Sequence, residues 1–156
     1  MTLDRLLHWI GANLSGTCAT DVGISFLRSR LPANLTPDWL MKLLSAHALA
    51  GTSFSLSEDH DKSGIGAEVL WLRPEQIVSE CIECQPGKSV LSFGFLAIGA
   101  CEFGSGDPYF LDLRSSSSDP PLVRVAHDYA RAQPYPLERI EMVSSNLSEF
   151  FRNARF

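Results

Sequence analysis

Residues 94–114 read Gly-Phe-Leu-Ala-Ile-Gly-Ala-Cys-Glu-Phe-Gly-Ser-Gly-Asp-Pro-Tyr-Phe-Leu-Asp-Leu-Arg. Two short apolar runs flank a glycine-rich turn, a pattern typical of a β-hairpin. We predict that Gly104 and Gly106 are structural turn residues, because glycine adopts positive φ angles without steric strain. Pro108 has no backbone N–H to donate, so it belongs to the same turn, at the mouth of the second strand.

The segments on either side of this hairpin predict an α+β fold. Helical periodicity and capping residues indicate helices at about residues 3–14, 21–30, 37–50, 74–80 and 147–154. Apolar runs bounded by turn residues indicate strands at about residues 52–56, 68–72, 89–98, 108–113 and 122–127. Helices followed by successive strands and a closing helix favour a mostly antiparallel, twisted sheet with helices packed on one face. The other face is then a natural platform for a partner.

Length and composition indicate one domain over residues 1–156. The chain is 45% hydrophobic and 20% charged, as expected of a globular protein with its own core. No apolar run approaches the roughly 18 residues of a membrane span, and no leader cleavage site follows the N-terminus. We expect a cytoplasmic protein without membrane contact, either a monomer or a homodimer.

The negative charge is concentrated in the middle of the chain. Residues 51–113 hold ten acidic and three basic residues, a net charge of −7, whereas the whole chain carries −5. A field of this sign repels phosphate backbones, so we expect no direct binding of nucleic acid, while a basic protein would be attracted. The alternative is a solvated acidic surface that only keeps the protein soluble.

The four cysteines predict neither a redox centre nor a metal site. Cys81 and Cys84 have CxxC spacing, but they follow the predicted helix at 74–80 instead of standing at a helix N-terminus, where a thiolate is stabilised. A zinc site would also need a second ligand pair, and the chain has none of similar spacing. We therefore expect buried or inert thiols.

An enzyme would have to use Asp107, Asp112 and His127, or the acidic cluster at 58–61, around a metal or a water. Asp107 and Asp112 are five residues apart, so a regular strand points them to opposite faces. The glycine-rich turn lacks the lysine and the following helix of a phosphate-binding loop. We predict no catalytic residue, cofactor or metal, and keep a metal-dependent hydrolase as a weaker alternative.

Four segments in order resemble the SUKH superfamily, which includes Smi/Knr-like cell-wall regulators and many bacterial immunity proteins. They are Phe26 with the Leu31-Pro32 step, residues 68–77, residues 96–113 with the Gly106-Asp107 pair, and residues 123–127 with 147–150. Two places depart from the family pattern, because residues 48–51 read Ala-Leu-Ala-Gly and Arg73 stands where a serine is usual. Residues 1–16 read as an extra or divergent helix.

The resemblance implies a non-enzymatic protein-binding module. Bacterial members typically neutralise toxins, often nucleases, by binding them in the cytoplasm, and other members act as scaffolds. We therefore expect an immunity protein that binds a basic toxin domain, with a scaffold for an endogenous partner as the alternative. The candidate partner-binding residues are acidic: Glu58, Asp59, Asp61, Glu102 and Asp107. For Asp107, capping of its own turn is favoured over partner contact.

Overall fold

The computed structural model describes residues 1–102 and 106–156. Gly104, which we predict to be a structural turn residue, lies outside the described residues. The helices are α1 (Leu3–Ile10), α2 (Asp21–Arg30), α3 (Asp38–Ala46), α4 (Pro74–Ile82), α5 (Gly87–Val90) and α6 (Leu147–Asn153). The strands are β1 (Ser53–Leu56), β2 (Ala67–Trp71), β3 (Phe95–Cys101), β4 (Tyr109–Asp112), β5 (Leu122–Arg124) and β6 (Glu141–Ser144). Short 3-10 turns occupy 11–13, 33–35, 91–93, 127–129 and 137–139.

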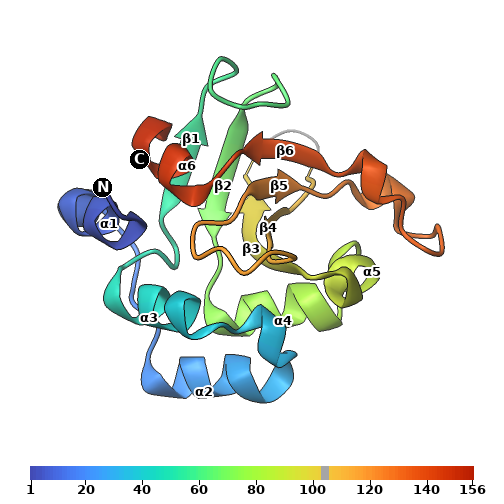
Figure 1. Cartoon of the computed structure of the whole chain (residues 1–156), viewed down its shortest axis with the longest axis horizontal. Coiled ribbons are helices and arrows are strands. Elements are labelled where there is room, and N and C mark those ends of the chain that lie inside the picture. Colours follow the sequence, from blue (N-terminus) through green and yellow to red (C-terminus); the bar gives the residue numbers. More distant parts are fainter. Residues whose placement is uncertain (103–105) are drawn as a thin grey trace.

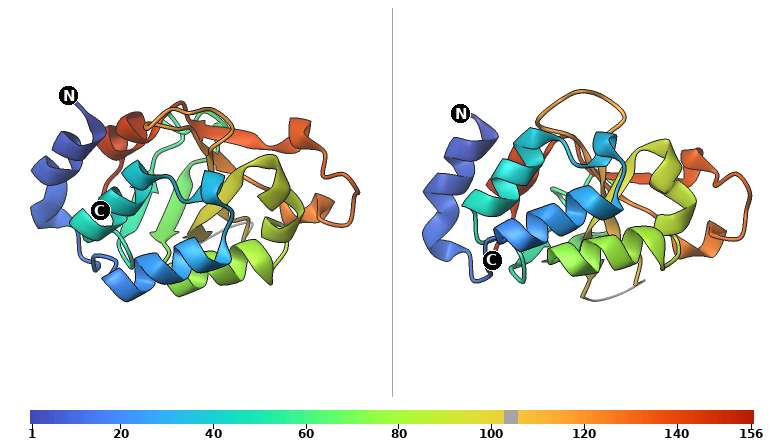
Figure 2. Two further views of the ribbon diagram at one scale, coloured as in Figure 1. Left: turned by 60° about the horizontal axis from the view of Figure 1, so that its bottom comes forward. Right: turned by 90° about the horizontal axis from the view of Figure 1, so that it is seen from below.

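The strands form one six-stranded antiparallel sheet in the order β1-β2-β3-β4-β5-β6 (Figure 1). Each strand pairs with its neighbour in the chain, as consecutive strands commonly do. Helices α1 to α5 lie on one side of this sheet (Figure 2). The predicted α+β class, with an antiparallel sheet and helices on one face, is confirmed.

Helices α2 and α6 begin where a side chain satisfies one of the first backbone N–H groups. Thr20 caps α2 by accepting a hydrogen bond from the N–H of Gly23, and Asn146 caps α6 by accepting from the N–H of Glu149. Pro74 occupies the first turn of α4, where a missing N–H costs nothing. These starts agree with the sequence prediction, whereas α3 begins at Asp38 and ends at Ala46, four residues before its predicted end.

Aromatic side chains hold α6 against the first two strands. Phe54 of β1 lies edge-on to Phe150 and Phe151 of α6, with ring centroids 5.7 and 5.3 Å apart. Trp71 of β2 lies 5.6 Å from the ring of Phe151. Leu7 of α1 is fully buried in the same core. The N-terminal helix is therefore part of the hydrophobic core, with α1 packed on α6.

Two register shifts curl the sheet. One lies between Ala97 and Gly99 of β3, and the other between Leu122 and Val123 of β5. Such bulges bend a strand and increase its local twist. The backbone N–H of Lys62, in the loop between β1 and β2, donates to the carbonyl of Val143 in β6 at 3.0 Å. A loop at one end of the sheet thus reaches the strand at the other end.

Two strand predictions were wrong in extent, and one strand of the structure was not predicted. The strand expected at 89–98 begins only at Phe95, because residues 87–93 are helical and Gly94, at φ +96°, redirects the chain. The strand expected at 122–127 ends at Arg124. Strand β6 was not predicted at all, since two of its four side chains, Glu141 and Met142, face solvent.

Candidate functional site

The strongest candidate site is an open hollow of about 360 Å³ at the end of the sheet where the loop between β1 and β2 lies. Its lining includes Glu58, Ile65, Glu68, Cys101, Tyr109 and Arg124. Glu58 and Ile65 come from the loop between β1 and β2, and the other four come from strands β2 to β5. The fold thus gathers at one place side chains that are distant in the sequence.

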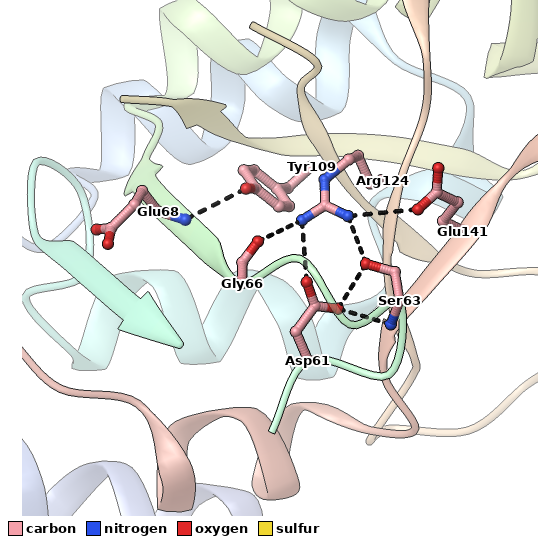
Figure 3. Close-up of polar contacts among 7 residues, drawn as sticks. All are labelled: Asp61, Ser63, Gly66, Glu68, Tyr109, Arg124 and Glu141. Atoms are coloured by element: carbon pink, nitrogen blue, oxygen red, sulfur yellow. Dashed lines mark hydrogen bonds and ion pairs between the residues drawn. The ribbon is translucent and has the colours of Figure 1, made fainter. Parts of the chain in front are cut away.

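Arg124 on β5 lines this hollow and is the centre of a network of polar contacts (Figure 3). Its terminal nitrogens donate to Asp61 Oδ2 at 3.2 Å, to Ser63 Oγ at 2.7 Å and to the carbonyl of Gly66 at 2.9 Å. Glu141 Oε2 lies 3.6 Å from the same guanidinium. Arginine, with five N–H donors in a planar fork, can satisfy several acceptors at once. It therefore ties the β1–β2 loop to β5.

Asp61 is buried, so its predicted place on an exposed binding surface was wrong. Its side chain is 0% exposed and pairs with Arg124. Asp61 Oδ1 also accepts hydrogen bonds from the N–H and the hydroxyl of Ser63, both at 2.8 Å. A buried carboxylate is tolerated when it is paired and hydrogen-bonded in this way. Its role in the fold is to hold the loop.

Tyr109, at the start of β4, is a second buried polar residue of the hollow. Its hydroxyl accepts a hydrogen bond from the N–H of Glu68 at 3.3 Å, and the Arg124 guanidinium lies 5.3 Å from the centre of its ring. Burial raises the pKa of Tyr109, and this effect exceeds the opposite effect of Arg124. The phenol therefore stays neutral at physiological pH.

Glu58 and Glu68 give the hollow a negative charge. Glu68 Oε1 accepts a hydrogen bond from the hydroxyl of Ser55 at 2.8 Å, while Glu58 lies exposed in the β1–β2 loop. Within residues 1–102 and 106–156, neither carboxylate forms an ion pair. The positive charge of Arg124 is already matched by Asp61 and Glu141. The charge that remains at the hollow is therefore negative.

Two further acids of the predicted binding set, Asp59 and Glu102, lie near the hollow. Asp59 is exposed in the β1–β2 loop. Glu102 is exposed just beyond β3, and its backbone N–H donates to the carbonyl of Glu68 at 3.1 Å. The structure thus brings Glu102 beside Glu68. Glu68 itself is not one of the predicted binding residues. The alternation of Glu68 with buried neighbours in β2 is the signal that could have placed it on the less buried face, whereas its pairing with Ser55 follows from the register of β1 and β2.

Asp107 lies in a different setting, beside His127. Asp107 Oδ1 accepts the backbone N–H of His127 at 3.1 Å and also contacts His127 Nδ1. Gly106 has φ +76°, as expected of a turn glycine, and Pro108 is buried just before β4. Together with Glu80, Cys84 and Cys101, residues Gly106, Pro108 and His127 line a second hollow of about 450 Å³.

The residues considered for an enzyme come together only in part. Asp107 meets His127, but Asp112 instead accepts hydrogen bonds from Arg114 Nε and Nη2 at 2.9 and 2.8 Å. In the cluster at 58–61, Asp61 points inward while its neighbours are exposed. No group of three or more His, Cys, Asp or Glu residues suited to a metal ion occurs among the described residues.

Cys18, Cys81 and Cys84 are free thiols. Cys81 lies buried within α4, and burial raises its pKa to about 11. Cys84 follows the end of that helix, so the CxxC pair does not sit at a helix N-terminus. The predicted burial is confirmed for Cys81, and its raised pKa disfavours the thiolate, which is the reactive form.

Comparison of the chain with protein-family models, with curated proteins and with solved structures finds no match. In the part of the chain that the structure describes, every helix is too short or too polar to cross a bilayer. The observations above define the chain as an α+β protein with an acidic hollow at one end of an antiparallel sheet.

Proposed function

We propose that the protein is a non-enzymatic binding module that neutralises a basic protein toxin, as a bacterial immunity protein of the SUKH kind does in the cytoplasm. The observation that carries this proposal is the charge of the hollow. Glu58 and Glu68 line it without an ion pair among the described residues, and its one cation, Arg124, is buried against Asp61.

This charge favours a basic protein over other partners. Negative potential at a concave surface raises the encounter rate with a positively charged protein and lowers it with nucleic acid. Glu102 and Asp59, exposed near the hollow, extend the acidic region beyond it. Nuclease toxins, which must bind phosphate backbones, have the complementary charge.

The resemblance to the SUKH superfamily supports the same function. Residues 68–77, which resemble the family's strand, proline and helix, span most of β2 and the start of α4. The Gly106-Asp107-Pro108 step leads directly into β4. The order of elements along the chain is therefore compatible with the family pattern from which the function was inferred.

Co-expression with the toxin domain encoded beside this gene tests the proposal. We expect growth rescue and a stable complex, whose association slows on the order of tenfold as salt rises from low to high concentration. Absence of rescue and of a complex would contradict the immunity function. Recovery of a housekeeping protein from native lysate, in place of a toxin, would instead favour the scaffold alternative.

A further inference from the structure

We propose that the hollow receives one arginine or lysine side chain of the partner protein, with Glu58 and Glu68 as the groups that bind its charge. This inference rests on the proposed function, because it names the feature of the partner that the hollow recognises. It assigns the hollow as a specificity pocket within a larger interface.

Arg124 does not make the hollow a site for anions. Its Nη1 donates to Ser63, and its Nη2 donates to Asp61 and Gly66. The side chain is only 4% exposed. A phosphate or carboxylate entering the hollow would therefore have to displace these internal contacts while approaching two unpaired glutamates.

The acceptors at the mouth of the hollow are better suited to a cation. Glu68 uses Oε1 to accept the Ser55 hydroxyl, and Oε2 has no donor within the described part of the chain. The carboxylate of Glu58 likewise accepts no hydrogen bond from the described residues. Arg155 lines a neighbouring hollow with Glu68, but the ion pairs among the described residues do not include one between them. An ammonium or guanidinium group would supply the missing donors.

The apolar part of the lining suits the stem of a long basic side chain. Ile65, at the rim, is 61% exposed although it is a large apolar residue. Lysine and arginine place their methylene groups along such surfaces while the charged end meets polar partners. The volume of about 360 Å³ lies at the lower end of the range for ligand pockets. Both features fit a single side chain better than a bulky ligand.

Blocked tripeptides provide a direct probe. We would titrate the isotope-labelled protein with acetylated, amidated Gly-Arg-Gly and Gly-Lys-Gly, and follow the backbone amides of Glu58, Ile65 and Glu68 by NMR. Gly-citrulline-Gly is the matched control, because citrulline has nearly the shape of arginine without its charge. Saturable shifts with a basic peptide, and binding at least about tenfold weaker with citrulline, are expected. Equal binding of both, or no saturable shift at these amides, would overturn the proposal.

Charge-removing variants locate the binding. Glu58→Gln and Glu68→Gln should each weaken binding of the basic peptide by about threefold to tenfold, and the double variant by more. Asp21→Asn removes the same charge from α2, at the other end of the molecule in Figure 1, and should leave binding unchanged. Equal effects of Asp21→Asn and Glu68→Gln on peptide binding would show that the peptide responds only to the overall negative charge of the protein, and would overturn the assignment of the hollow as its binding site.

The toxin complex separates this inference from the proposed function. A toxin complex that forms normally with the Glu58→Gln/Glu68→Gln variant would refute the pocket and leave the immunity function standing. Peptide binding at the hollow without any toxin complex would refute the immunity function and leave the pocket standing. Tighter binding of propylguanidine, which carries the same single charge, than of the blocked arginine peptide would show a site for small free cations and overturn the assignment to a protein side chain.

Discussion

Arg124 and Asp61 form a buried ion pair across 63 residues of chain, with Nη2 and Oδ2 3.2 Å apart. The pair joins β5 to the loop between β1 and β2 at the point where the sheet curls. Because the same loop carries Glu58 and Ile65, the pair also sets the shape of the hollow. Stability and the candidate site therefore depend on one contact.

Removing either partner of this pair should strongly destabilise the fold. Arg124→Met or Asp61→Asn leaves the other group buried without its partner, and we expect a loss of about 3–5 kcal/mol in the free energy of unfolding. Urea denaturation of the single and double variants measures this loss. The double variant should lose less free energy of unfolding than the two single variants lose together. Arg73→Met, which breaks an exposed pair with Glu75, is the control and should cost less than about 1 kcal/mol. A similar loss in both arginine variants would contradict the role of burial.

The sequence predicted elements well where local signals decide them. Helix α2 has the predicted bounds of 21–30, since a capping threonine precedes it and Pro32 follows it. Strands β1, β2 and β4 lie within a residue or two of their predicted ranges. Strand β6 could not be predicted, because its sequence has no alternating pattern. It is a strand because it pairs with β5.

The site was less predictable than the fold. An excess of acid in residues 51–113 is visible in the sequence, but the burial of Asp61 depends on Arg124, which lies far along the chain. Tyr109 was recognised only as part of a strand, and its place below Glu68 follows from the pairing of β2 to β4 through β3. Charge composition predicts the sign of a surface, whereas the tertiary fold selects which charges stay exposed.

Asp112 should stabilise the fold at neutral pH and lose this contribution in acid. Burial alone would raise its pKa, but hydrogen bonds from the Arg114 side chain and N–H, with the charge of Arg114, outweigh burial and lower it. A carboxyl with a lowered pKa stabilises the fold above its ordinary pKa, and this contribution is lost as pH falls through the folded value. Asp112→Asn should cost about 1 kcal/mol at pH 7 and much less near pH 2. Urea unfolding at both pH values tests this, and an equal cost at each would contradict it.

Gly106 should resist substitution because of its backbone angle and not because of crowding. Its φ is +76°, and a Cβ built at this position meets no atom of the described residues within 4 Å. Gly106→Val should lower the free energy of unfolding by about 1–3 kcal/mol, Gly106→Ala by less, and Gly106→Asn least, since asparagine tolerates the left-handed region. Thermal unfolding of the three variants gives the order. Valine tolerated as well as asparagine would refute the turn assignment.

The contribution of Glu80 to stability should depend on pH in the opposite direction to that of Asp112. Burial raises its pKa, so the folded state binds the proton more tightly than the unfolded state does. The fold therefore loses stability as pH rises from the unfolded pKa through the folded pKa, and the ionised carboxylate is unfavourable at pH 7. Glu80→Gln should stabilise the protein at pH 7 by less than about 1 kcal/mol, because water still reaches this half-exposed group. Near pH 3 the two proteins should be equally stable. Glu138→Gln, at an exposed position, is the control, and an equal gain there, or a gain that persists in acid, would contradict the assignment to burial of Glu80.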